Sequence, residues 1–144
     1  MIKRAVAADA GEIAAMAVQM WNEHSLHELT DEFSVGILQG KAHFFVKYEQ
    51  GIPVGFAECG LRHDYVEGTE TSPVGYLEGV FVKEPYRHRG YAKELLSACE
   101  TWSKEQGCTE FASDCELDND SSFRFHMATG FEEANRIICF TKKL

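Results

Sequence analysis

The chain has 144 residues, the length of one domain, and residues 1–144 are expected to form a single folded unit. Hydrophobic residues make up 44% and charged residues 26%, a balance that lets a globular protein bury a substantial core. The formal net charge of −9 argues against a general nucleic-acid binder, whose phosphate contacts need a basic face, and suits a cationic partner. No apolar run reaches the length of a membrane span, and the N-terminus lacks the apolar segment of a signal peptide.

The five cysteines are odd in number, and no two of them have CxxC spacing. In a chain without an export signal, this pattern predicts free thiols in a reducing cytoplasm. The six histidines do not combine with the cysteines at metal-ligand spacing, so no structural metal site is expected.

The first half of the chain predicts a strand, two helices and a β-hairpin. These elements are expected at residues 2–7, from Asp9 to Trp21, after Thr30, and at 42–49 and 53–60. The first helix has a capping-box pattern, with Glu12 three residues after Asp9. Its apolar side chains recur at helical spacing and form one stripe: Ile13, Met16, Ala17, Met20 and Trp21.

The second half alternates strands with helices. After a polar loop over 62–73, strands are expected at 75–82, 109–115 and 136–142, and helices at 90–107 and 118–128. Gly79 interrupts the first of these strands, which indicates a bulge or a close backbone approach. Asp118 or Asn119 is expected to cap the last helix. The whole pattern predicts a mixed α/β sheet of six or seven strands flanked by about four helices.

The segment from Val80 to Ala92 is a strand that runs into a basic, glycine-containing turn and then opens a helix. Backbone N–H groups at a helix start are unpaired and attract anions, and Gly90 allows close approach. The basic side chains of Arg87, His88 and Arg89 add positive field, so this turn suits a pyrophosphate. It is neither a P-loop nor a GxGxxG turn, and an ordinary strand–helix turn with basic surface residues is the alternative.

The same segment resembles the cofactor loop of the GNAT acetyltransferase superfamily, which reads Arg/Gln-x-x-Gly-x-Gly/Ala. Here the matching residues are Arg87, Gly90 and Ala92, and downstream Asn119, Ser122, Gly130 and Phe131. The order of the expected elements matches the superfamily over essentially the whole chain. The resemblance implies a GNAT-like, largely antiparallel α+β sheet and acetyl-CoA as co-substrate.

A narrower resemblance is to the bacterial aminoglycoside 6′-N-acetyltransferases. It rests on residues 61–68 and 72–82, on Trp21, and on the segment 112–114. It implies an acetyl-CoA-dependent antibiotic-resistance enzyme in the cytoplasm, usually a homodimer, with a small cationic amine as substrate. It also implies substrate contacts at Trp21, Tyr65, Glu78 and Asp114. The implied cofactor contacts are Val80, Phe81, Val82, Asn119 and the loop Arg87, His88, Arg89, Gly90, Tyr91 and Ala92.

Two positions depart from the pattern. The family carries an acidic substrate contact a few residues after the Gly-Phe pair, and this chain has Asn135 there, with Glu132 and Glu133 nearby. One ammonium contact is therefore expected to be weakened, unless one of these glutamates replaces it. The acid tyrosine that is frequent in the superfamily's last helix is also missing, and His126 occupies its place. His126 is expected to be a solvated helix residue, with a general acid for the departing thiolate as the alternative.

Acetyl transfer to a primary amine needs a group that takes the amine's proton, because such an amine is mostly protonated at neutral pH. Glu78, beside the glycine break, is the best candidate, either to hold the ammonium or to accept its proton, and an exposed strand residue is the alternative. The N–H of Phe81 or Val82, freed by a bulge, is expected to stabilise the oxyanion.

Asp114 ends a strand at the edge where open α/β sheets bind ligands, or it is a plain loop carboxylate. Trp21 is either a core residue or an aromatic wall for a sugar ring. Three rival functions remain: acetylation of another small amine such as a polyamine, acetylation of a protein or peptide, and a non-catalytic CoA-binding module.

Overall fold

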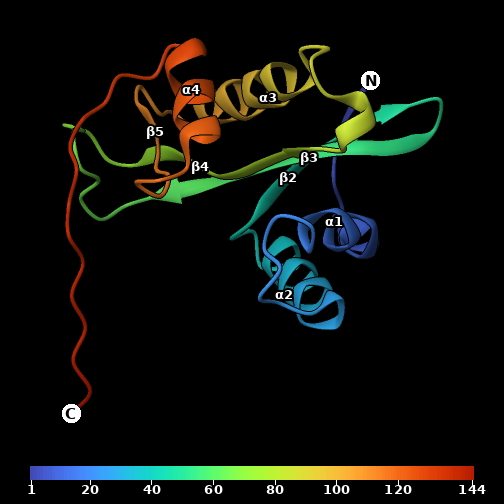
Figure 1. Ribbon diagram of the computed structural model, residues 1–144, viewed down its shortest axis with the longest axis horizontal. Helices are drawn as coiled ribbons and strands as arrows, with labels where there is room; N and C mark the ends of the chain where they lie inside the picture. Colours follow the sequence, from blue (N-terminus) through green and yellow to red (C-terminus); the bar gives the residue numbers. More distant parts are fainter.

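The computed structural model describes residues 1–144 and contains one five-stranded sheet with helices on both faces (Figure 1). The elements, with η for a 3-10 turn, are β1 (Ile2–Arg4), η1 (Ala7–Asp9), α1 (Ala10–Ala17), α2 (Leu26–Leu38), β2 (His43–Glu49), β3 (Ile52–Arg62), β4 (Val74–Val82), η2 (Glu84–Tyr86), α3 (Tyr91–Glu105), β5 (Phe111–Ser113) and α4 (Asp120–Ala128). The strands follow the order β1-β2-β3-β4-β5, and only β4 and β5 are parallel. The mixed, largely antiparallel sheet and the four helices are as expected, but there are five strands instead of six or seven.

The missing strand is the one expected at 136–142. Residues 131–144 contain neither helix nor strand, and the red end of the chain runs away from the sheet in Figure 1. A strand needs a neighbour for its backbone N–H and C=O groups, and this segment pairs with no strand of its own chain. Its apolar side chains are left in solvent, with Ile138 81% and Phe140 88% exposed.

The N-terminal helix is shorter than expected, and its capping box does not form. The Asp9 carboxylate accepts a hydrogen bond from the Val6 N–H at 2.8 Å, and it pairs with Lys3. Glu12 instead accepts the Tyr48 hydroxyl. Since α1 ends at Ala17, Trp21 lies in the turn that follows the helix.

Helices α1 and α2 cover one face of the sheet. Helix α2 begins earlier than expected, because the Ser25 hydroxyl caps it by accepting the Glu28 N–H at 3.1 Å. The two helices enclose a core with side chains of β2, β3 and β4: Ile13, Met16, Leu29, Phe33, Phe44, Val46, Phe56 and Phe81.

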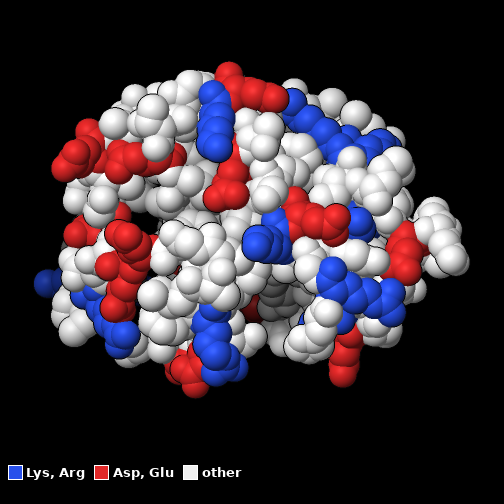
Figure 2. Space-filling model, turned by 90° about the horizontal axis from the view of Figure 1, so that it is seen from above, with Lys and Arg blue, Asp and Glu red and all other residues white.

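Helix α3 covers the opposite face and begins and ends at the two glycines expected for it. Gly90 has a φ of 82° at its start and Gly107 a φ of 90° after its end, in the left-handed region that favours glycine. Its buried side chains meet those of β3 and β4 in a second core: Leu95, Leu96, Cys99 and Trp102 with Ala57, Cys59, Leu77 and Val82. Figure 2 looks onto the α3 side, where acidic and basic side chains are interspersed.

Strand β4 carries the bulge that its glycine indicated. Glu58 of β3 pairs with Gly79, but the next residue, Cys59, pairs with Leu77, so Glu78 is an extra residue in β4. Pairing with β5 ends at Leu77 and Ser113, which leaves the rest of β4 with an open edge. The bulge and the open edge together shape the site described below.

None of the helices is both long enough and apolar enough to cross a membrane.

Candidate active site

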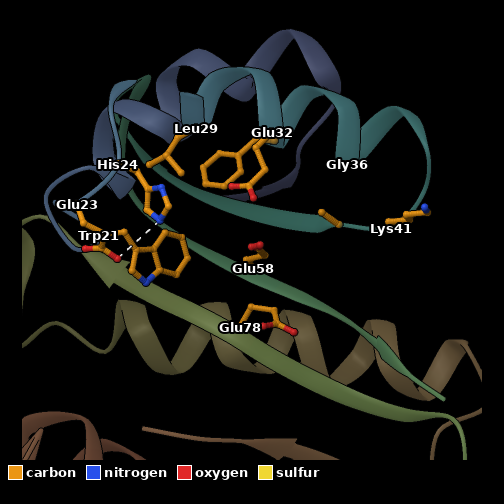
Figure 3. Close-up of a pocket in the computed structure, with 11 residues that line it drawn as sticks. Trp21, Glu23, His24, Leu29, Glu32, Gly36, Lys41, Glu58 and Glu78 are labelled. Atoms are coloured by element: carbon orange, nitrogen blue, oxygen red, sulfur yellow. Dashed lines mark ion pairs between the residues drawn. The ribbon is translucent and has the colours of Figure 1, made fainter. Parts of the chain in front are cut away.

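A cavity of about 460 Å³ lies between α2 and the sheet (Figure 3). Its lining comes from the turn after α1, from α2, and from β3 and β4, and it is rich in carboxylates. Figure 3 shows Glu32 of α2, Glu58 of β3 and Glu78 of β4 around this space. No arginine lines the cavity, and Lys41 after α2 is its one lysine. Such a concave acidic site suits a cation with several amino groups.

Trp21 forms one wall of the cavity and rests directly on the β4 bulge. A Cβ atom at Gly79 would lie 2.7 Å from Cζ2 of the indole, so only glycine allows this contact. The ring also packs edge-on against Phe33 and Phe56, with centroids 6.4 Å and 6.2 Å away. Trp21 thus satisfies both sequence interpretations, because it packs against the core and also lines the cavity.

Glu78 lies in the cavity but is bound by a neighbouring arginine. Its Oε1 accepts hydrogen bonds from Arg62 Nη2 at 2.6 Å and Nε at 3.2 Å. The same guanidinium stacks 3.9 Å above the Tyr76 ring, and the Tyr76 hydroxyl donates to Asp114. The predicted substrate contacts Glu78 and Asp114 are therefore connected through Arg62 and Tyr76. The ion pair with Glu78 raises the pKa of Arg62, and burial together with Asp114 raises the pKa of Tyr76.

Glu58 is the site residue that the sequence interpretation missed. Its carboxylate lines the cavity opposite the bulge and forms no hydrogen bond within the protein. Burial, and next the charges of Glu78 and Glu32, raise its pKa to about 7. The signal in the sequence was a single acidic residue within an otherwise apolar run over 52–61, which is unusual for a strand buried on both faces.

The open edge of β4 presents backbone N–H groups. The Lys83 N–H bonds to Val54 O at 2.8 Å, and because hydrogen-bonded pairs alternate along antiparallel strands, Phe81 also faces β3 while Val80 and Val82 face the open edge. Arg87 Nε donates to Val82 O at 2.7 Å from that open side, in agreement with this alternation. The geometry therefore favours Val82 over Phe81 as the oxyanion donor.

The turn before α3 carries a row of free amides. No protein oxygen accepts a hydrogen bond from the N–H groups of residues 88–93, and the first bond of the helix joins Glu94 N–H to Gly90 O at 3.1 Å. Arg89 pairs with Glu49 at 3.2 Å, whose carboxylate also accepts the Tyr91 hydroxyl. Six unpaired donors at the start of a 15-residue helix form a site for an anion.

The remaining predicted contacts lie outside the cavity. Tyr65 is 75% exposed, and its hydroxyl accepts the Gly68 N–H at 3.4 Å. Asn135 is exposed and donates from Nδ2 to Glu67 at 3.0 Å, so it packs against the same loop. Of the two nearby glutamates, Glu133 is paired with Arg136.

Asn119, one of the two caps expected from the sequence, caps α4 by accepting the Ser122 N–H at 3.1 Å.

His126 of α4 is not a solvated residue. Its Nδ1 lies 2.6 Å from Ser122 O and its Nε2 2.8 Å from the hydroxyl of Ser113, which ends the β4–β5 pairing. The imidazole therefore reaches the point where β4 and β5 separate.

Three features agree with one known family: the separation of β4 from β5, the bulge in β4, and the free amides at the start of α3. The model of the acetyltransferase (GNAT) family matches residues 10–131, and the chain belongs to this family.

Two relatives of this chain carry a more specific name than that of the family. The aminoglycoside N(6′)-acetyltransferase type 1 of Stenotrophomonas maltophilia is 40% identical over 145 residues, covering 99% of this chain and 93% of that protein. The protein of the same name from Salmonella typhimurium is 44% identical over 99 residues, 69% of this chain and 68% of its own.

Solved structures of aminoglycoside N-acetyltransferases are similar to this chain over its whole length. The aminoglycoside N-acetyltransferase AAC(6′)-Iy in complex with CoA superposes with a TM-score of 0.94 at 35% identity, over 100% of this chain and 95% of that one. A structure of AAC(6′)-Iy with the bisubstrate analogue CoA-S-monomethyl-acetylneamine gives a TM-score of 0.93 at 35% identity, over 100% and 98%.

Proposed function

We propose that this protein transfers the acetyl group of acetyl-CoA to the 6′-amino group of aminoglycoside antibiotics. The observation that carries the proposal is the acidic cavity at the β4 bulge, with the open edge of β4 leading from it toward the free amides before α3. The first feature suits a polyamine-like drug and the second a pyrophosphate. The names and bound ligands of the relatives support the same pair of substrates.

The cofactor is held by the turn before α3. The amides of residues 88–93 bind the pyrophosphate of CoA, and the positive end of the helix dipole and the guanidinium of Arg87 favour its charge. The backbone of Val80, Phe81 and Val82 lines the path toward the cavity, and Asn119, which caps α4, is a further cofactor contact of the proposal. The residues present fit this group because each unpaired amide needs an acceptor.

The drug binds at the other end of the gap. Trp21 provides a flat apolar wall for a sugar ring, and Glu78 holds an ammonium group. Arg62 now contacts both Glu78 and the Tyr76–Asp114 pair, which supports this place as one that attracts a cation. Tyr65 and Asn135, which lie outside the cavity, contact further parts of the drug.

The reaction needs a hydrogen-bond donor that stabilises the negative charge developing on the thioester oxygen. The N–H of Val82 supplies it, because the alternation of β4 aims this group at the open edge. His126 is near the end of that edge and protonates the departing thiolate.

A thiol-release assay with acetyl-CoA and a panel of amines tests the function. We expect turnover with drugs that carry a 6′-amine and none with drugs that carry a 6′-hydroxyl in its place. Faster turnover with a linear polyamine than with every 6′-amino drug would leave the acetyltransferase activity but reject the drug as substrate.

We also propose a homodimer in the cytoplasm. Ile137, Ile138 and Phe140 are 68%, 81% and 88% exposed in a segment without a strand partner, and β5 is an edge strand of only three residues. Adding this segment to the sheet of a second copy satisfies its backbone and covers these side chains. The cytoplasm is supported by the five cysteines, all of which are free thiols.

A further inference from the structure

We propose that the Glu58 carboxylate is the general base of the reaction and takes the proton from the substrate's 6′-ammonium group. The proposal rests on the proposed function. It assigns separate roles to two neighbouring carboxylates, with Glu78 holding the charge of the ammonium and Glu58 receiving its proton.

The first argument is the place of Glu58 in the sheet. Glu58 is the direct cross-strand neighbour of Gly79, so its side chain emerges beside the bulge of β4 and lines the cavity there. Trp21 sits over the same glycine and walls this part of the cavity. An amine bound against Trp21, on the face of β3 and β4 that lines the cavity, therefore lies beside Glu58.

The second argument is that Glu58 is free and Glu78 is not. Two N–H groups of Arg62 bind one oxygen of Glu78, and protonating that carboxylate would break the ion pair. No donor in the protein binds the carboxylate of Glu58, although the residue is half-buried. A half-buried carboxylate that no protein group binds is open to the contents of the cavity, and an ammonium group there would compensate for its desolvation.

The surrounding charges suit a base that works near neutral pH. Glu78 of β4 and Glu32 of α2 face Glu58, Glu23 and His24 lie at the cavity rim, and Lys41 is the lysine of the lining. Burial and the two nearest carboxylates bring the pKa of Glu58 to about 7, so it is both available and basic at that pH.

The step balances as follows. The ammonium nitrogen gives one proton to the Glu58 carboxylate, and the free amine attacks the thioester carbonyl carbon. A C–N bond forms and the C–S bond breaks. His126 gives a proton to the departing thiolate and takes up the second amine proton, and Glu58 releases its proton to solvent.

The test uses the full-length protein with a 6′-amino drug and saturating acetyl-CoA, and compares Glu58→Gln with the matched cavity variant Glu32→Gln. In the wild-type protein, kcat/KM for the drug should rise through about pH 7, below the range in which the drug's own amine titrates. Glu58→Gln should lose this rise and about 10²–10⁴ in kcat, with the KM of acetyl-CoA unchanged. Glu32→Gln should keep the rise but move it to a lower pH, because one of the charges that raise the pKa of Glu58 is then removed.

A Glu58→Gln protein that keeps the rise and a kcat near the wild-type value overturns the proposal. If that variant does not fold, Glu58→Asp decides, because a shortened base should keep the rise but lose at least about tenfold in kcat. An unchanged kcat in Glu58→Asp overturns it. Failure of the proposed function looks different, since the wild-type protein itself would then acetylate no 6′-amino drug.

Discussion

At the scale of single residues, the burial of Glu58 links stability to pH. Its pKa lies near 7 in the folded protein and near the ordinary glutamate value of about 4.3 in the unfolded chain. The folded state therefore binds this proton more tightly than the unfolded chain does. The stability that the proton contributes is complete below about pH 4 and is lost as pH rises through 7.

Glu58→Gln should remove this dependence. At pH 8 the variant should be more stable than the wild-type protein by about 2 kcal/mol, a value reduced from the full shift because the cavity admits water. At pH 4 the two proteins should be equally stable. Urea unfolding at a series of pH values measures this, and a wild-type stability that does not fall between pH 5 and 8 would contradict it.

Asn135 is one of the two positions at which the chain departs from the pattern that the resemblance implies. Asn135→Asp should place two carboxylates side by side, Asp with Glu67, where the amide now donates a hydrogen bond. We expect tighter binding of drugs with several ammonium groups, by at most about fivefold because the site is exposed. The effect should fade at high salt, and the KM of acetyl-CoA should not change. Weaker drug binding in low salt would show that Asn135 does not face the drug.

At the scale of elements, the start of α3 determines cofactor binding. Gly90 has a left-handed φ of 82°, so Gly90→Val should distort the turn and misdirect the amides. The KM of acetyl-CoA should rise by about tenfold or more, the value of a lost charge-assisted hydrogen bond, with little change in the KM of the drug.

The opposite end of the helix offers a matched control. Gly107 also has a left-handed φ, of 90°, and a side chain there would meet open space. Gly107→Val should cost about as much stability and leave both KM values unchanged. Equal effects of the two substitutions on the KM of acetyl-CoA would show that the start of α3 is not its site.

The β4 bulge shapes the part of the site that binds the drug. Gly79→Ala should push the Trp21 ring from its place, because the new Cβ would be 2.7 Å from the indole, and the KM of the drug should rise several-fold. Gly60→Ala on β3 is the control, since its Cβ would meet the nearest atom at an ordinary 3.5 Å. Steady-state kinetics with both substrates measure the difference, and an unaltered drug KM in Gly79→Ala would remove Trp21 from the site.

At the scale of the whole molecule, the exposed C-terminal segment should hold two copies together. Burial of Ile138 and Phe140 contributes about 1.5–3 kcal/mol for each side chain. Ile138→Glu should therefore convert a dimer to a monomer in analytical ultracentrifugation. Ile52→Glu, at an equally apolar but distant position that is 49% exposed, should not change the mass. A wild-type protein that sediments as a monomer would reject the dimer.

Much of the site could be predicted from the sequence because its signals are local. The glycine at position 90 after basic residues marks the start of α3, and the glycine at 79 marks the bulge. Both depend on the backbone conformation of a few consecutive residues. The same short patterns carry the resemblance to the family.

Only the tertiary structure decided which side chains meet. The carboxylates of Glu32, Glu58 and Glu78 come from three elements, and strand register alone brings Glu58 opposite Gly79. Arg62 reaches Glu78 from a different strand, 16 positions away in the chain. The last strand was predicted from a correct local pattern, but a strand exists only where a neighbour can bind its backbone, and one chain provides none for residues 136–142.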